Sequence, residues 1–131
     1  MKLLLDTHIW VWALMRPDRL SRVVKRQLDS PRNEVFLSPI SIWEAHHLNR
    51  RGKLGINGSF ESWLDRSLVQ LPVVEAPFNF AVATESSRIQ LPEPDPGDTI
   101  LAATAAVLDL TLVTSDSQLL NCTWLKTLAN K

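Results

Sequence analysis

The chain has 131 residues, of which 45% are hydrophobic, and its 14 basic and 14 acidic side chains cancel. This length matches one average domain, and the hydrophobic content is that of a packed globular core, which excludes a disordered chain. The balanced charge argues against a protein that coats DNA generally, since such proteins are strongly basic. Cys122 is the only cysteine, so neither an intrachain disulfide nor a cysteine-based zinc site can form. We therefore expect a single domain over residues 1–131.

The N-terminal segment carries one lysine and then a short apolar run that ends at Asp6. This run is too short for a signal peptide or a membrane-spanning helix, and no other segment is long and apolar enough to cross a bilayer. We expect a soluble, cytoplasmic protein that makes no membrane contact.

Strand-like and helix-like runs alternate along the whole chain. In chain order the predicted elements are a strand at 2–5, helices at 8–15 and 21–28, a strand at 34–37, helices at 38–52 and 60–68, a strand at 71–74, helices at 78–88 and 98–108, and a strand at 111–114. This alternation predicts a parallel sheet with helices on both faces. The tail from Thr123 is compatible with either an edge strand or a final helix.

Four acidic residues occur where these predicted elements meet. Asp6 and Asp116 directly follow predicted strands, whereas Glu44 and Asp98 lie in or at the start of helices. Ligands of an open parallel sheet bind beyond the carboxyl ends of its strands, near the point where strand order reverses, so we expect all four acids to face that end. Oxygen ligands of this kind suit Mg²⁺ or Mn²⁺ rather than zinc. The pattern therefore predicts a divalent-cation site.

Such a site is suited to hydrolysis of a phosphodiester. One ion would lower the pKa of a bound water and direct it at phosphorus, and a second would stabilise the departing oxygen. Thr7, Thr114 and Ser115 lie beside the acids in sequence and are candidates for orienting the carboxylates or holding waters.

Each acid taken alone also has a structural explanation. An Asp that precedes a helix is commonly its N-cap, which would account for Asp6 and Asp98. Glu44 lies three residues after Ser41, a spacing that fits a capping box. Because capping does not explain why four acids gather at one end of a sheet, we prefer the cation site.

Three segments carry a resemblance to a known family. They are LLLDTHIWVWAL, SPISIWEAHHLNRRGKL and DPGDTILAATAAVLDLTLVTSD, which occur in the expected order and cover nearly the whole length. The chain resembles the PIN-domain family and, within it, the VapC-like toxin ribonucleases of bacterial toxin–antitoxin pairs. The resemblance implies a three-layer α/β/α sandwich with a central, mostly parallel sheet. It also implies that the matching positions form the Mg²⁺ or Mn²⁺ site, namely Asp6, Glu44, Asp98 and Asp116.

The same resemblance implies the activity and the partners. The expected activity is metal-dependent endoribonuclease cleavage of RNA that leaves a 5′-phosphate and a 3′-hydroxyl. The expected partners are a second copy of the chain, in a homodimer, and an inhibitory cognate antitoxin protein. Leu48 and Thr99 stand where similar sequences often carry Lys and Arg, a difference that concerns substrate positioning and leaves the metal ligands intact.

Two groups near Glu44 have both a structural and a functional interpretation. We interpret His46 and His47 as a partly exposed pair on a helix, with RNA contact or proton transfer as the alternative. The basic residues at the end of the same helix are interpreted as compensation of the helix dipole, with contact to the phosphate backbone as the alternative. They are Arg50, Arg51 and Lys53.

Trp10 and Trp12 project roughly 200° apart on a helix, so we expect one of them to be more exposed than the other. An exposed tryptophan would line a groove for an antitoxin helix or a dimer contact.

Two other classes of function compete with the nuclease hypothesis. A Mg²⁺-binding, phospho-accepting signalling domain would need a lysine soon after a late strand, but the strand at 111–114 is followed by no lysine until Lys126. A non-catalytic binding module would keep the acids for folding, and it predicts that divalent ions affect neither stability nor RNA integrity.

Overall fold

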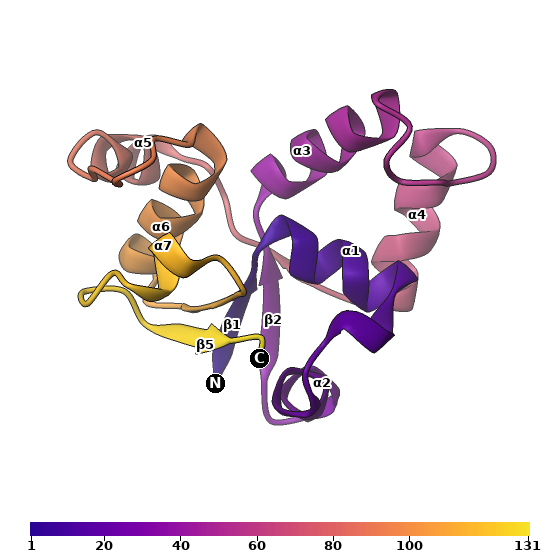
Figure 1. Cartoon of the computed structure of the whole chain (residues 1–131), viewed down its shortest axis with the longest axis horizontal. Coiled ribbons are helices and arrows are strands. Elements are labelled where there is room, and N and C mark those ends of the chain that lie inside the picture. The colour runs from indigo at the N-terminus through magenta and orange to yellow at the C-terminus, as the bar shows by residue number, and fades with distance from the viewer.

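In the computed structural model, which describes all 131 residues, one sheet lies between two groups of helices (Figure 1). The sheet has five strands in the order β3-β2-β1-β4-β5, and every neighbouring pair is parallel. The strands are β1 (Lys2–Leu5), β2 (Glu34–Leu37), β3 (Val74–Glu75), β4 (Thr111–Thr114) and β5 (Thr127–Ala129). The helices are α1 (Thr7–Met15), α2 (Arg22–Asp29), α3 (Pro39–Arg50), α4 (Phe60–Gln70), α5 (Phe80–Ser86), α6 (Pro96–Leu108) and α7 (Ser117–Leu120), with a 3-10 turn at Pro17–Arg19. The predicted α/β/α sandwich is confirmed, and its sheet is wholly parallel.

The strand order reverses beside β1. From β1 the chain adds β2 and then β3 on one side, and it later places β4 and β5 on the other side. Leu3 of β1 pairs with Val35 of β2 and with Thr111 of β4, so β1 is the central strand. The carboxyl ends of β1 and β4 therefore flank the point at which ligands of such sheets bind.

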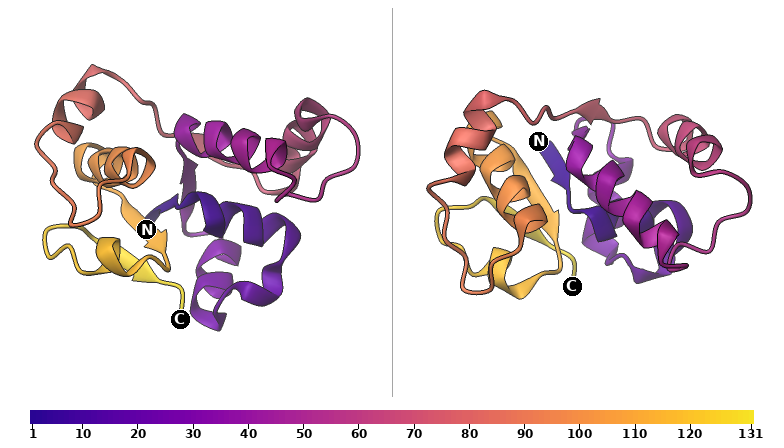
Figure 2. Two further views of the ribbon diagram at one scale, coloured as in Figure 1. Left: turned by 45° about the horizontal axis from the view of Figure 1, so that its top comes forward. Right: turned by 90° about the horizontal axis from the view of Figure 1, so that it is seen from above.

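Successive side chains of β1 enter two separate cores, one on each face of the sheet. Leu3 and Leu5 pack with residues of α1, α2, α3 and α4, whereas Leu4 packs with residues of α6 and α7. All three leucines are fully buried, as the uninterrupted apolar run predicts for a strand covered on both faces. The two views of Figure 2 show α6 and α1 on opposite sides of the sheet.

Helix α3 closes the carboxyl edge of the sheet. It joins the first core through Ala45, and it contacts both α1 and α6. Trp10 and Trp12 of α1 differ as expected: Trp10 is fully buried, with its ring centroid 5.5 Å from that of Trp63, whereas Trp12 is partly exposed. None of the helices combines the length and the apolar character needed to traverse a bilayer.

Several predicted boundaries are wrong for local reasons. The strand predicted at 71–74 is reduced to Val74–Glu75, preceded by Pro72, which has no N–H to donate to a ladder. The helix predicted at 78–88 covers only Phe80–Ser86, because Asn79 caps it by accepting a hydrogen bond from the Val82 N–H.

Two further differences bear on the site. The N-cap of α6 is Asp95 rather than Asp98, so the helix begins at Pro96. The short helix α7 was not predicted, and the tail from Thr123 contributes the edge strand β5 rather than a final helix.

The core on the α6 side yields a stability prediction. Leu101 is fully buried, so Leu101→Ala should lower the free energy of unfolding by about 2–5 kcal/mol through lost burial and a residual cavity. Val69→Ala on α4 is the control, because Val69 is 80% exposed and its truncation should change the free energy by less than about 0.5 kcal/mol. Urea unfolding followed by tryptophan fluorescence measures both, and equal effects would contradict this description of the core.

Candidate active site

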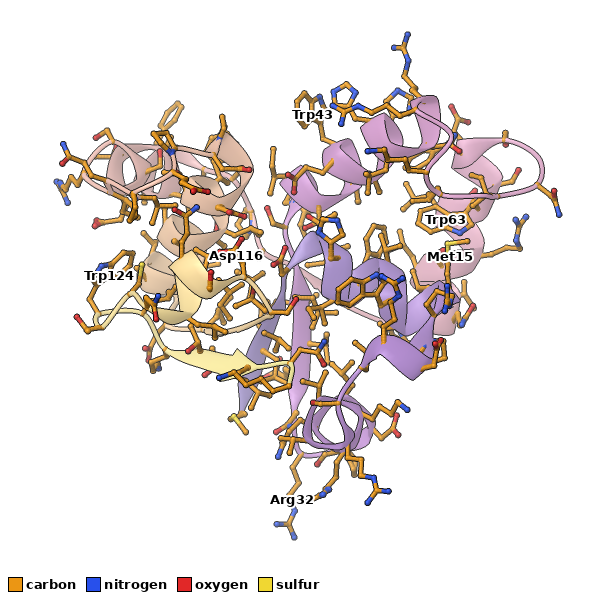
Figure 3. All side chains as sticks on the ribbon, viewed as in Figure 1. Met15, Arg32, Trp43, Trp63, Asp116 and Trp124 are labelled. Atoms are coloured by element: carbon orange, nitrogen blue, oxygen red, sulfur yellow. The ribbon has the colours of Figure 1, made fainter.

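A pocket of about 580 Å³ opens at the carboxyl ends of β1 and β4. All four predicted acids line it, as does a fifth carboxylate, that of Asp95. Figure 3 shows Asp116 on the α6–α7 side of the molecule and Trp43 on α3. The remaining lining residues are Thr7, His8, Trp12, Trp43, His47, Leu48, Arg51 and Ser115. The expectation that the four acids gather at one end of the sheet is confirmed.

The side chain of Asp6 points away from the helix that it precedes. Asp6 occupies the N-cap position of α1, but its side chain makes no capping hydrogen bond. Its Oδ2 instead accepts a buried hydrogen bond of 2.7 Å from the Thr114 hydroxyl, and the same hydroxyl oxygen accepts one of 3.0 Å from the Asp116 N–H. The capping explanation is wrong for the Asp6 side chain, and Thr114 connects the acids that follow β1 and β4.

Glu44 lies inside α3 rather than in its capping region. The N-cap is Ser38, whose hydroxyl accepts from the Ile40 N–H, so the capping box expected with Ser41 does not form. Oγ1 of Thr7 lies 2.5 Å from Oε1 of Glu44 and 2.9 Å from Oγ of Ser41. An ionised carboxylate only accepts and a hydroxyl carries one hydrogen, so Thr7 donates to Glu44 and Ser41 donates to Thr7.

A glycine lets α6 approach the Glu44 carboxylate. A Cβ atom on Gly97 would overlap that carboxylate, which belongs to α3. A glycine inside a helix costs about 1 kcal/mol relative to alanine. The close approach of Glu44 supplies a physical reason for glycine at this position.

Two other acids do cap helices at the pocket. Oδ1 of Asp95 accepts from the Asp98 N–H at 3.1 Å, which leaves Asp98 as the third residue of α6. Oδ1 of Asp116 accepts from the N–H groups of Gln118 and Leu119, at 2.9 and 3.2 Å. The Gln118 amide reaches Oδ2 of Asp98 at 3.4 Å. Helix capping thus accounts for the hydrogen bonds to one oxygen of Asp95 and one oxygen of Asp116. It does not account for the position of the Asp98 side chain in the pocket.

The five carboxylates share one property. In each of them at least one oxygen accepts a hydrogen bond, and in all of them except Asp6 the other oxygen accepts none. None of them forms an ion pair with a lysine or an arginine. The protein therefore fixes the carboxylates but leaves their charge uncompensated.

Three of the carboxylates in the pocket have raised pKa values, namely Asp6, Glu44 and Asp98. Burial, and after it the neighbouring carboxylates of Asp95, Asp6 and Asp116, together raise the pKa of Asp98 from its ordinary 3.8 to about 7. Burial also raises the pKa of Asp6 against the opposing hydrogen bond from Thr114, and it raises the pKa of Glu44 against that from Thr7.

Sequence reasoning missed Asp95 and Gln118. The pattern Asp95-Pro96 had a readable signal, because an N-cap followed by proline at the first helical position is a common helix start. Gln118 had none, because its contacts with Asp98 and with the backbone of Glu93 depend on the path of the proline-rich loop.

Only one residue of the histidine pair and only one of the basic cluster line the pocket. His47 lines the pocket, whereas the His46 ring packs against Phe60 with centroids 5.3 Å apart. Of the three basic residues at the end of α3, only Arg51 lines the pocket.

Comparison with known proteins identifies the family. The family model of the PIN domain matches residues 3–124. The chain belongs to the PIN domain family. Members of this family are nucleases and generally use divalent metal ions. A comparison with curated proteins found no match.

Solved structures similar to this PIN domain include toxin–antitoxin complexes. VapBC2 from Rickettsia felis, bound to a DNA fragment from its promoter, shares 18% identity over 100% of both chains with a TM-score of 0.70. DNA-bound VapBC from Salmonella typhimurium shares 14% identity over 100% of this chain and 99% of that chain, with a TM-score of 0.71. FitAcB from Neisseria gonorrhoeae shares 27% identity over 95% of both chains, with a TM-score of 0.63. Similarity at this level establishes the fold.

The donor atoms of this PIN domain are of the chemical type that binds a hard divalent cation. Five carboxylates line one pocket, four of them with an oxygen that accepts no hydrogen bond, and oxygen ligands are those that Mg²⁺ and Mn²⁺ prefer. No three histidine, cysteine, aspartate or glutamate side chains stand close enough together to enclose a cation as they are arranged. The carboxylates thus surround a shared space without closing on one point.

The contact between Gly97 and Glu44 predicts a selective loss of nuclease activity. Gly97→Ala should displace the Glu44 carboxylate and lower the cleavage rate by about tenfold or more, since misplacement by about 1 Å is costly in catalysis. Gly97 is the second residue of α6, where alanine gains less helix propensity than the roughly 1 kcal/mol of a helix interior, so this gain should offset only part of the steric cost in stability. The control is a double-mutant cycle with Glu44→Asp, whose shorter side chain relieves the overlap, so Gly97→Ala should cost less in that background. Equal costs in both backgrounds would contradict the predicted contact.

The raised pKa of Asp98 predicts how the stability of the metal-free protein depends on pH. The folded state binds this proton more tightly than the unfolded state, so the stabilisation is complete below about pH 4 and is lost as pH rises through about 7. The full effect of this pKa change would be about 4 kcal/mol, and solvent at this half-exposed site screens it to about 1–2 kcal/mol. In EDTA, Asp98→Asn should match the wild type near pH 4 and exceed its stability by that amount at pH 8. Urea unfolding across this pH range measures the difference, with Asp65→Asn as the control, and parallel profiles would contradict the prediction.

Proposed function

We propose that this chain is a metal-dependent endoribonuclease and the toxin component of a type II toxin–antitoxin system, acting in the cytoplasm as one PIN domain over residues 1–131. The observation that carries the proposal is the set of five carboxylates at the topological switch point, none of which forms an ion pair with a lysine or an arginine. Bare carboxylates repel a phosphodiester, so this pocket accepts RNA only together with divalent cations.

The proposed ligands of the Mg²⁺ or Mn²⁺ ions are Asp6, Glu44, Asp98 and Asp116. A bound divalent cation supplies Lewis acidity towards the phosphate oxygens and lowers the pKa of a water molecule near it. Thr114 and Thr7 each donate a hydrogen bond to one oxygen, of Asp6 and of Glu44 respectively, and so would orient these carboxylates for a cation. Hydrolysis by water in line with the leaving oxygen yields a 5′-phosphate and a 3′-hydroxyl.

Asp95 and Gln118 each form a hydrogen bond to Asp98, one to its backbone and one to its side chain. The Asp95 side chain fixes the start of α6 and so the position of Asp98, while Gln118 contacts the Asp98 carboxylate from α7. We assign both to positioning of Asp98 rather than to the primary ligand set.

The proposed partners are a cognate antitoxin and a second copy of the chain. The VapBC and FitAB structures are toxin–antitoxin complexes, which supports an antitoxin partner here. Exposed apolar side chains also support one, since Phe80 is 93% and Val69 is 80% exposed. The competing phospho-accepting domain would need a lysine beside an acidic residue, and no lysine lines the pocket.

An RNA digest tests the proposed activity. Purified protein should cleave single-stranded RNA with Mg²⁺ or Mn²⁺ and lose activity in EDTA, and Asp98→Asn should lower the rate by about 100-fold or more. Asp65→Asn is the control, because Asp65 is exposed on α4 and does not line the pocket. Cleavage that survives both EDTA and Asp98→Asn, or products that end in 2′,3′-cyclic phosphates, would contradict metal-dependent hydrolysis.

A further inference from the structure

One wall of the pocket carries a row of side chains that the proposed chemistry does not use. Trp43, His47 and Arg51 follow one another at intervals of four residues, so they lie on one face along α3 and its C-cap. All three line the pocket that holds the carboxylates. At a rise of 1.5 Å per residue the row is about 12 Å long, and it starts beside Glu44.

Trp43 and Trp124 are the two largely exposed tryptophans of this chain, and of these two only Trp43 lines the pocket. Trp10 and Trp63 are buried in the first core and Trp12 packs against that core, whereas Trp43 belongs to neither core and is 58% exposed. The Trp43 ring packs edge-on against the His47 ring, with the two ring centroids 4.0 Å apart and an interplanar angle of 85°. This contact fixes the indole at the pocket wall, so folding alone does not account for a large exposed aromatic ring at this place.

Arg51 supplies the positive charge of the row. It is the only lysine or arginine that lines the pocket, and it forms no ion pair. Arg50 precedes it on the same helix end but does not line the pocket. A helix-dipole role would apply to both arginines, so it does not explain why one of them faces the pocket.

We propose that Trp43, His47 and Arg51 form a nucleotide subsite that binds single-stranded RNA next to the scissile phosphate, a proposal that rests on the proposed function. Trp43 stacks on the base nearest to the carboxylates, His47 holds the indole in place, and Arg51 contacts a phosphate further along the strand. Stacking requires an unpaired base and tolerates different bases, so the subsite selects for single strands more than for sequence.

An RNA strand fits this wall better than a protein segment does. Trp43 and Glu44 line the same pocket, so a strand whose phosphate lies at the carboxylates can place a neighbouring base against Trp43. An aromatic ring followed by an unpaired arginine matches the alternation of base and phosphate along a strand. A protein occupant is the alternative that the experiment below distinguishes.

Steady-state kinetics on a short single-stranded RNA test the subsite in the full chain with Mn²⁺. Trp43→Ala should raise KM about tenfold or more and change kcat by less than about threefold, because stacking stabilises bound substrate and transition state alike. Trp43→Phe should restore most of the KM, since a flat ring remains. Trp124→Ala is the matched control: Trp124 is 52% exposed, lies outside the pocket, and sits apart from Trp43 in Figure 3. Arg51→Gln should raise KM and weaken its dependence on salt, whereas Arg50→Gln should do neither.

The same RNA with one abasic unit next to the cleavage site separates stacking from other effects. The abasic unit should raise KM for the wild type as Trp43→Ala does, and it should add little to the KM of Trp43→Ala. Equal KM values for Trp43→Ala and Trp124→Ala would overturn the subsite and leave the wall to a protein partner. If the wild type cleaves no RNA, the proposed function fails, and binding of the labelled RNA in the same buffer decides this inference: Trp43-dependent binding supports the subsite, and Trp43-independent or absent binding overturns it.

Discussion

Repulsion among the carboxylates at the carboxyl ends of β1 and β4 is the constraint on which the rest of the structure depends. The sheet order brings Asp6 and Asp116 to the same edge, and the Thr114 hydroxyl holds them there through the Asp6 side chain and the Asp116 backbone. Burial of Asp98, and after it repulsion by the neighbouring carboxylates, raises the pKa of this residue to about 7. Because no lysine or arginine forms an ion pair with these carboxylates, their neutralisation depends on protons or metal ions, and the second is the basis of the proposed activity.

The pocket has two walls with different chemistry. The α6–α7 side carries Asp98 and Asp116, and the α3 side carries Trp43, His47 and Arg51 beyond Glu44. Gly97 allows the two sides to meet at the Glu44 carboxylate, so the position of this acid depends on the packing of α3 on α6. This geometry links the helix packing directly to the placement of a proposed metal ligand. It also leaves Trp43, His47 and Arg51 of the α3 side exposed to the pocket, where they would contact the RNA substrate.

The sequence predicted the buried parts of the fold well and the short elements poorly. The ranges of β1, β2 and β4 were predicted correctly because each is an apolar run covered on both faces. The extent of β3 and the existence of α7 were not, because two- and four-residue elements depend on tertiary contacts such as the Ala76 N–H to the Leu37 carbonyl. The gathering of the four acids in one pocket was predicted from their positions at the junctions of alternating strands and helices and from the family resemblance. The helix capped by Ser38 was predicted at the correct start, whereas the start of α6 at its cap, Asp95, was not predicted.

The most direct test of this account is the binding of Mn²⁺ to the purified protein, measured by titration calorimetry at neutral pH. The account predicts saturable binding that Asp98→Asn or Asp116→Asn weakens by about tenfold or more, while Asp65→Asn leaves it unchanged. Absence of saturable binding to the wild type, or equal affinities for the wild type and the Asp98→Asn variant, would contradict the claim that these carboxylates form a divalent-cation site.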